Sequence, residues 1–341
     1  MSQSLRSGRV VVVGLSMAAL LVACQITGAW HYVNDADLLS HPAPRHSAVT
    51  RNHEFILSQQ LIDNSLELFG TNGAHVDTVP LGGMWRSMAN ATYRGPKIEV
   101  DGREVDREAF LVLHANGWII PWYHSRGQLT TAPFPHWVKM PPRDRDLDSR
   151  SFLDIDQHAD GTIYVLGSAR PQGAGSHGRL WQRSPAGDWS HVDKGADGEF
   201  LYKVTAVAVD KQVGRVAVAS EPVGHKVHVD VYETDLTPKE QRIRENTRSL
   251  VDMDYFLGHF YLGVNTVVGP GDYKFEIEIR NGAWGVTHQR DVARVEAISL
   301  DLPGLPVSSK NYHNVFLWST GADENPGDGD FYYIHEYELR P

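Results

Sequence analysis

The chain has 341 residues and a mass of 38.0 kDa; with 41% hydrophobic and 22% charged residues, it can bury a sizeable core and is not globally disordered. The formal net charge of −10 and the lack of a basic run exclude a nucleic-acid-binding protein, because phosphate contacts need a basic face. A single cysteine excludes a disulfide framework and a zinc site with several cysteine ligands.

The first predicted element is a secretory signal. Arg6 and Arg9 precede an uncharged stretch over 10–23, which is too short for a membrane-spanning helix of about 20 residues but suits a signal peptide. This stretch ends in a Leu-Val-Ala-Cys sequence at Cys24, which resembles the lipobox of bacterial lipoproteins. The resemblance implies that 1–23 is a lipoprotein signal peptide and that the Cys24 thiol carries lipid, including palmitate. An ordinary signal peptide and an uncleaved N-terminal anchor are the alternatives.

The residues after the cysteine predict where the protein lies. By analogy with the lipoproteins of enteric bacteria, Gln25 in place of an aspartate favours the outer membrane over the inner membrane. We therefore expect a lipid-anchored protein that faces the periplasm or the cell surface, with the membrane as one partner. Residues 24–52 contain Pro42, Pro44 and several histidines, and we interpret them as a lipidated tether.

From residue 53 the sequence changes to short apolar stretches separated by tight turns. Asn116-Gly117 and Asp160-Gly161 are strong hairpin signals, because both central residues of such turns need a positive φ. Similar hairpins recur at spacings of 42, 52, 49 and 42 residues, counted from Phe110, Phe152, Val204, Met253 and Val295. A period near 45 residues with about four strands per unit is typical of a β-propeller blade.

We therefore predict that 53–341 is an all-β domain. The expected fold is a six-bladed β-propeller, with seven blades as the other count and β-sandwich domains as the alternative. Helix is expected to be scarce. Thr237-Pro238 resembles a helix start, but Ile243 is the only apolar residue over 241–246, so a short helix and an exposed strand are equally compatible with the segment.

One acidic segment resembles part of a calcium loop. Asp154, Asp156 and Asp160 precede or join a glycine turn, and calcium prefers such oxygen ligands. The spacing does not match an EF-hand, because Val165 stands where the twelfth-position acid belongs. The favoured interpretation is a polar strand followed by a hairpin turn, with calcium as a weak alternative and no other cofactor.

Aromatic residues are the other candidate binding feature. Trp118, Trp122, Tyr123 and Trp137 lie close together in the sequence. Core packing between sheets is the favoured interpretation, and any of them left exposed would suit a protein or glycan partner.

Two function classes follow from these features. The first is a lipoprotein that binds a protein partner, such as an immunity protein that neutralises a secreted toxin or an envelope scaffold. The acidic balance of the chain suits a basic partner. The second is a periplasmic propeller enzyme, a hydrolase or lyase acting on glycans, lactones or esters. No nucleophile motif is evident, so we assign no catalytic residue and favour the binding protein.

Overall fold

The computed structural model describes residues 29–37, 44–49, 54–59, 65–70, 74–80, 85–89, 98–100, 103–105, 110–114, 117–125, 128–132, 134–140, 152–169, 177–211, 213–221, 224–292, 295, 297–301, 316–322 and 332–340. The elements within these ranges are β-strands, apart from one 3-10 turn, η1 (Phe134–His136). No helix in this described part is long and apolar enough to cross a membrane.

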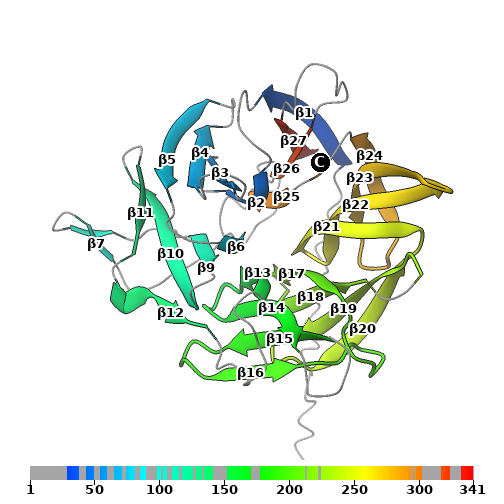
Figure 1. The fold of residues 1–341 in the computed structure, drawn as a ribbon, viewed down its shortest axis with the longest axis horizontal. Helices are drawn as coiled ribbons and strands as arrows, with labels where there is room; N and C mark the ends of the chain where they lie inside the picture. Colours follow the sequence, from blue (N-terminus) through cyan, green and yellow to red (C-terminus); the bar gives the residue numbers. More distant parts are fainter. Residues whose placement is uncertain are drawn as a thin grey trace, which may run out of the picture.

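The strands form antiparallel sheets of four or five strands, and the sheets stand as blades around a central axis (Figure 1). The first three blades, each from its innermost strand outward, are blade 1 with β2 (Pro44–Val49), β3 (Glu54–Gln59), β4 (Ser65–Gly70) and β5 (His75–Pro80); blade 2 with β6 (Trp85–Ala89), β9 (Phe110–His114), β10 (Trp118–Ser125) and β11 (Gln128–Thr131), plus β12 (Val138–Lys139) beside β10; and blade 3 with β13 (Phe152–Gln157), β14 (Ile163–Ala169), β15 (His177–Arg183) and β16 (Trp189–Val192).

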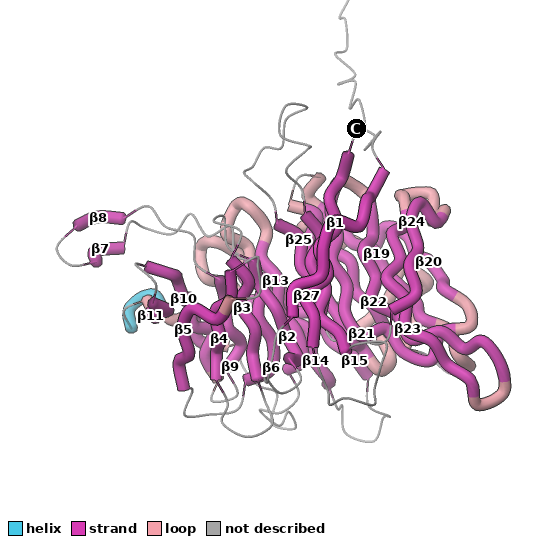
Figure 2. Tube along the Cα trace, turned by 90° about the horizontal axis from the view of Figure 1, so that it is seen from above, coloured by secondary structure: helices cyan, strands magenta, loops and turns pink. Residues whose placement is uncertain are grey.

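The remaining blades, in the same order, are blade 4 with β17 (Val204–Asp210), β18 (Arg215–Ser220), β19 (Val227–Glu233) and β20 (Pro238–Arg244); blade 5 with β21 (Thr247–Phe256), β22 (His259–Gly269), β23 (Asp272–Arg280) and β24 (Val286–Val292); and blade 6 with β25 (Ala297–Asp301), β26 (Phe316–Ala322), β27 (Tyr332–Arg340) and β1 (Ala29–Asp37). A separate hairpin of β7 (Ile98–Val100) and β8 (Arg103–Val105) projects from the body (Figure 2). The all-β propeller prediction is confirmed, with six blades.

The ring closes through the N-terminal strand. β1 pairs with β27, so that Ala29 lies opposite Arg340 and Asp37 opposite Tyr333. The predicted tether over 24–52 is therefore wrong where the chain forms β1 and β2. The strand β1 gave no hairpin signal because its partner lies at the other end of the chain, and local patterns report only neighbouring strands.

The innermost strands share an irregularity near their start. In five blades the pairing of this strand with the next shifts register at the same place, a β-bulge that lies between Pro44/His46, Trp85/Ser87, Phe152/Asp154, Val204/Ala206 and Leu250/Asp252. A bulge increases the local twist and re-aims side chains. As a result Phe152 and Ile155 both pack toward blade 2, whereas Val207 and Val209 pack toward blade 3.

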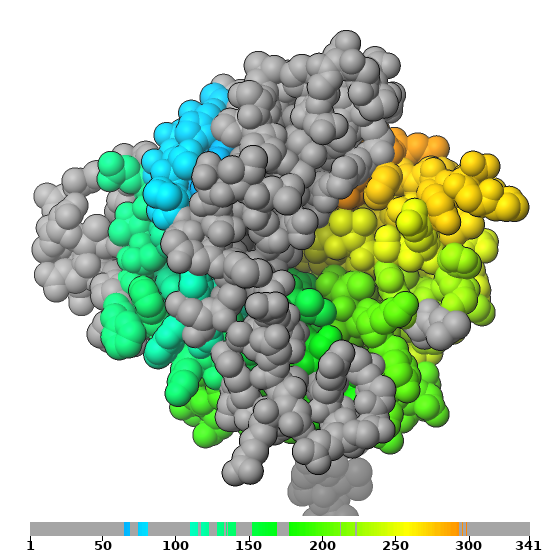
Figure 3. All heavy atoms as spheres, in the orientation of Figure 1, coloured from blue at the N-terminus to red at the C-terminus, as the bar shows by residue number. Residues whose placement is uncertain are grey.

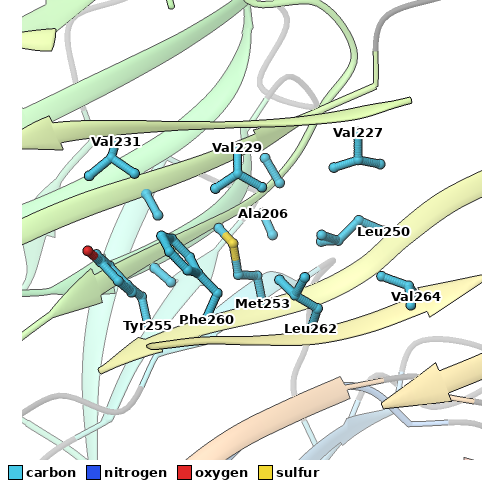
Figure 4. Packing of buried hydrophobic residues seen from close by; sticks show 13 residues of the cluster. Ala206, Val227, Val229, Val231, Leu250, Met253, Tyr255, Phe260, Leu262 and Val264 are labelled. Atoms are coloured by element: carbon cyan, nitrogen blue, oxygen red, sulfur yellow. The ribbon is translucent and has the colours of Figure 1, made fainter. Parts of the chain in front are cut away.

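The core consists of apolar clusters between neighbouring blades. Between blades 4 and 5 the larger side chains of Met253, Tyr255 and Phe260 pack against Val229, Val231 and the small side chains of blade 4 (Figure 4). Equivalent clusters join blades 1 and 2, 2 and 3, and 3 and 4. Each fully buried large side chain contributes about 1.5–3 kcal/mol, so the ring is held together blade by blade. Figure 3 shows that the described residues of blades 3 to 5, coloured green to yellow, adjoin one another on the surface.

One predicted equivalence is wrong. Phe110 begins β9, which is the second strand of blade 2, whereas Phe152 and Val204 begin innermost strands. The hairpin of β9 and β10 is as buried as an innermost hairpin, with Leu111, Val112 and Leu113 almost fully buried. Hydrophobicity alone therefore does not distinguish the two positions in a blade.

Candidate functional site

The candidate site is a set of carboxylates on the innermost strands of blades 3 and 5. Both strands carry an Asp-x-Asp sequence directly after the bulge: Asp154 and Asp156 on β13, and Asp252 and Asp254 on β21. Residues two apart on a strand point to the same side. The first pair points toward blade 4 and the second toward blade 6, as their hydrogen bonds show.

The carboxylates of blade 3 bind backbone amides of blade 4. Asp154 Oδ2 accepts a hydrogen bond from Val207 N at 2.7 Å, and Asp156 Oδ2 accepts one from Val209 N at 2.7 Å. The Oδ1 atoms of Asp154 and Asp156 accept from the next residue of β13, at 2.9 and 2.7 Å. The innermost strand has no further strand on its axial side, so its N–H groups need such acceptors.

The carboxylate of Asp252 repeats this arrangement between blades 5 and 6. Its Oδ1 accepts from Met253 N at 2.8 Å and its Oδ2 from Ile298 N at 2.7 Å. Burial raises the pKa of Asp252 well above the usual range of an aspartate, and the negative charge of Asp154 raises it further. Asp154 and Asp252 therefore affect each other's charge although they lie two blades apart along the ring.

A buried lysine lies beside the second aspartate of blade 3. Lys211, at the end of β17, places its Nζ 3.5 Å from Asp156 Oδ1, and both side chains are nearly inaccessible to solvent. Burial raises the pKa of Asp156, although Lys211 and the two backbone amides lower it in part. The pair therefore adds a positive charge to an otherwise acidic part of the ring.

The arrangement supplies two carboxyl groups that differ in proton affinity. When the environment separates the pKa values of two neighbouring acids, one can hold a proton while the other stays charged. Such a pair can donate and accept protons in hydrolysis or elimination at neutral pH. The same groups stabilise the ring, because each of them satisfies backbone amides.

The residues named as calcium candidates do not form a cluster. Asp154 and Asp156 lie on β13, whereas Asp160 lies in the following turn, where its Oδ1 accepts from Thr162 N at 2.8 Å. Within the described ranges, no group of three or more His, Cys, Asp or Glu side chains could hold a metal ion. Calcium binding remains a prediction.

The aromatic candidates separate into a core residue and a surface cluster. Trp122 is 6% exposed and packs between blades 1 and 2. Trp118 and Trp137 are partly buried, and each contacts Phe134, with ring centroids 5.5 and 5.4 Å away. Phe134 is 64% exposed. Tyr123 lies on β10 opposite Thr130, and its side chain is outside the described part, as is the whole of Cys24.

The sequence interpretation missed Asp252, Asp254 and Lys211. A signal for the aspartates exists, because Phe-Leu-Asp-Ile-Asp from Phe152 and Leu-Val-Asp-Met-Asp from Leu250 have the same pattern of apolar and acidic residues. Aligning the two hairpins on this pattern identifies both pairs. Lys211 carries no comparable signal.

Comparisons with known proteins identify the fold but no family. No family model and no curated protein matches the chain. Similar solved structures include a gluconolactonase from Xanthomonas campestris, with a TM-score of 0.56, 11% identity and coverage of 90% of this chain and 89% of the other. A PQQ-bound aldose sugar dehydrogenase from Streptomyces coelicolor has a TM-score of 0.52 and 12% identity, with 92% and 99% covered. A Dyadobacter fermentans protein of unknown function has a TM-score of 0.52 and 10% identity, with 92% and 100% covered. Identities this low show a shared fold alone.

Proposed function

We propose that the protein is a lipid-anchored β-propeller enzyme of the cell envelope, a hydrolase or lyase that acts on a lactone, ester or glycan. The observation that carries this proposal is the pair of innermost-strand carboxyl groups, Asp154 and Asp252, which occupy equivalent positions in two blades and influence each other's protonation. Two structures with this fold are a gluconolactonase and an aldose sugar dehydrogenase, which supports a sugar-derived substrate.

The two carboxyl groups have complementary roles in the proposed hydrolysis. The charged carboxylate of Asp154 takes a proton from the attacking water, while protonated Asp252 gives its proton to the oxygen that leaves the carbonyl or anomeric carbon. Proton transfer of this kind typically contributes 10²–10⁴-fold to a rate. Asp156 and Lys211 are neighbours that set the local charge.

A matched set of variants tests this proposal. The chain is screened against lactone, ester and glycoside substrates, and Asp154→Asn and Asp252→Asn are compared with Asp77→Asn. Asp77 makes the same two-amide arrangement between blades 1 and 2, with Leu129 N at 2.8 Å and Thr78 N at 3.0 Å, but it lies on an outermost strand. We expect the two axial variants to lose at least about 100-fold in kcat and Asp77→Asn to keep its activity. Equal losses in all three variants would reduce the axial aspartates to a structural role.

Protein binding is the second candidate function, and the cluster of Trp118, Phe134 and Trp137 favours it. An exposed aromatic ring supported by two others is typical of an interface residue. An immunity protein or an envelope scaffold would use such a surface. If wild-type protein captures one basic envelope or toxin protein and Phe134→Ala abolishes capture while no substrate is turned over, binding replaces catalysis as the function.

The lipid anchor in this proposal is tested at Cys24. Changing Cys24 to Ser should move the protein from the membrane pellet to the soluble fraction and remove incorporation of labelled palmitate. The observation that motivates the test is the lipobox-like sequence. A Cys24→Ser protein that stays lipidated would show that the anchor is elsewhere.

A further inference from the structure

We infer that the protein is held with one defined face of the ring against the lipid bilayer, and that the opposite face is kept away from it. This inference rests on the lipid anchor of the proposed function, and it adds which surface contacts the membrane. The argument uses the position of β1, the direction of the strands and the length of chain between Cys24 and Ala29.

The two faces of the ring are defined by the direction of the innermost strands. All six run the same way, so we call the face where they start the start face and the face where they end the anchor face. In blade 5 the turns at Leu257–Gly258 and 281–285 lie on the anchor face, whereas the turn at Pro270–Gly271 lies on the start face, because consecutive strands are antiparallel.

The strand β1 begins on the anchor face. It is antiparallel to β27, the third strand of blade 6, and Ala29 pairs with Arg340 at the end of that strand. The third strand of a blade runs in the direction of the first, so its end lies on the anchor face. Figure 2 shows the C-terminal end of β27 on the upper side of the molecule, opposite the long hairpin of β22 and β23.

The chain between the predicted lipid and the fold is short. Ala29 follows Cys24 by five positions, so even a fully extended chain spans about 17 Å. The ten residues of β21 span about 33 Å from face to face at roughly 3.3 Å per residue. The segment is therefore too short for the lipid to reach past the start face, and the bilayer must lie near the anchor face and the outer edge of blade 6.

This placement leaves the start face open to the surrounding solution. Its described loops include 193–203 and 221, 224–226, which connect strands of blades 3 and 4. A substrate for Asp154 and Asp252 would then approach from the start face, and a large partner would find that face accessible.

The experiment uses the lipidated full chain, reconstituted in vesicles that contain an acceptor dye on their lipid headgroups. Cys24 is the only cysteine and its thiol is blocked by the lipid, so an introduced cysteine takes a donor dye selectively. Ala283→Cys and Asp272→Cys form a matched pair, because both positions are exposed and lie on blade 5, on the anchor face and the start face respectively. We expect clearly more energy transfer to the membrane from position 283 than from position 272.

A linker variant provides the control. Inserting about 20 glycine and serine residues between 25 and 29 adds a flexible reach of about 25 Å, and the difference between the two positions should then disappear. Equal or reversed transfer in the vesicle-bound native-length chain would overturn the orientation while leaving the anchor intact. A full chain that fails to bind vesicles would overturn both, and loss of enzyme activity alone would affect neither.

Discussion

Single aspartates near the axis combine a structural and a chemical role. Asp252 accepts two backbone amides, and an asparagine offers only one carbonyl oxygen for them. We expect Asp252→Asn to destabilise the fold by about 1–3 kcal/mol at pH 4, the cost of one unsatisfied amide. The raised pKa of Asp252 means that its favourable contribution is complete below the unfolded pKa and is lost as the pH rises through the folded pKa. The deficit of the variant, measured by thermal melts from pH 4 to 8, should therefore shrink as pH rises.

Asp193→Asn provides the opposite sign. Burial acts to raise the pKa of Asp193, but hydrogen bonds from Arg179, one of them 2.8 Å long, outweigh it and lower the pKa. Its stabilisation is present above the unfolded pKa and is lost as pH falls. The deficit of this variant should shrink toward low pH, and the same trend in both variants would contradict the assignment.

A glycine on β15 shows how closely neighbouring blades approach. A Cβ at Gly178 would lie 2.1 Å from Val204 Cγ1, so Gly178→Ala should destabilise the protein by about 1–3 kcal/mol through overpacking. Val204→Ala removes the clashing atoms, and the double variant should recover part of the loss in a denaturant titration. Additive effects of the two changes would show that the blades do not meet at this point.

Among the strands, those joined by tight turns could be predicted from the sequence. Gly117 and Gly161 stand at the expected hairpins with φ of 96° and 95°, which glycine adopts without steric cost. The segment that left helix and strand open is the edge strand β20, where pairing with β19 outweighs the local helix-start pattern. At the site, Asp154 and Asp156 were identified, but their relation to Asp252 depends on how blades close around the axis, which no local pattern encodes.

Removing β1 tests the closure of the ring. A chain that starts at 38 lacks the outermost strand of blade 6 and exposes the edge of β27, so we expect a melting temperature at least several degrees lower, or aggregation. A chain that starts at 26 is the control and should melt like the mature protein. If the two melt at the same temperature by circular dichroism, β1 does not contribute to stability.

The whole molecule should unfold in one step. Apolar clusters join each described pair of neighbouring blades from 1 to 5, and β1 links the ends of the chain, so loss of one blade exposes the core of the next. We expect coincident urea transitions by tryptophan fluorescence and far-UV circular dichroism. Two separated transitions, or a limited digest with two stable halves, would instead indicate independent domains.

The pairing of Ala29 with Arg340 also sets a waiting time during biosynthesis. A ribosome adds about 5–20 residues per second, so β1 exists for roughly 15–60 seconds before β27 is made. Throughout that interval, and during any later passage in an unfolded form, β1 has no native partner. A nascent chain that stops early leaves it unpaired permanently, which makes incomplete copies natural targets for chaperones and proteases.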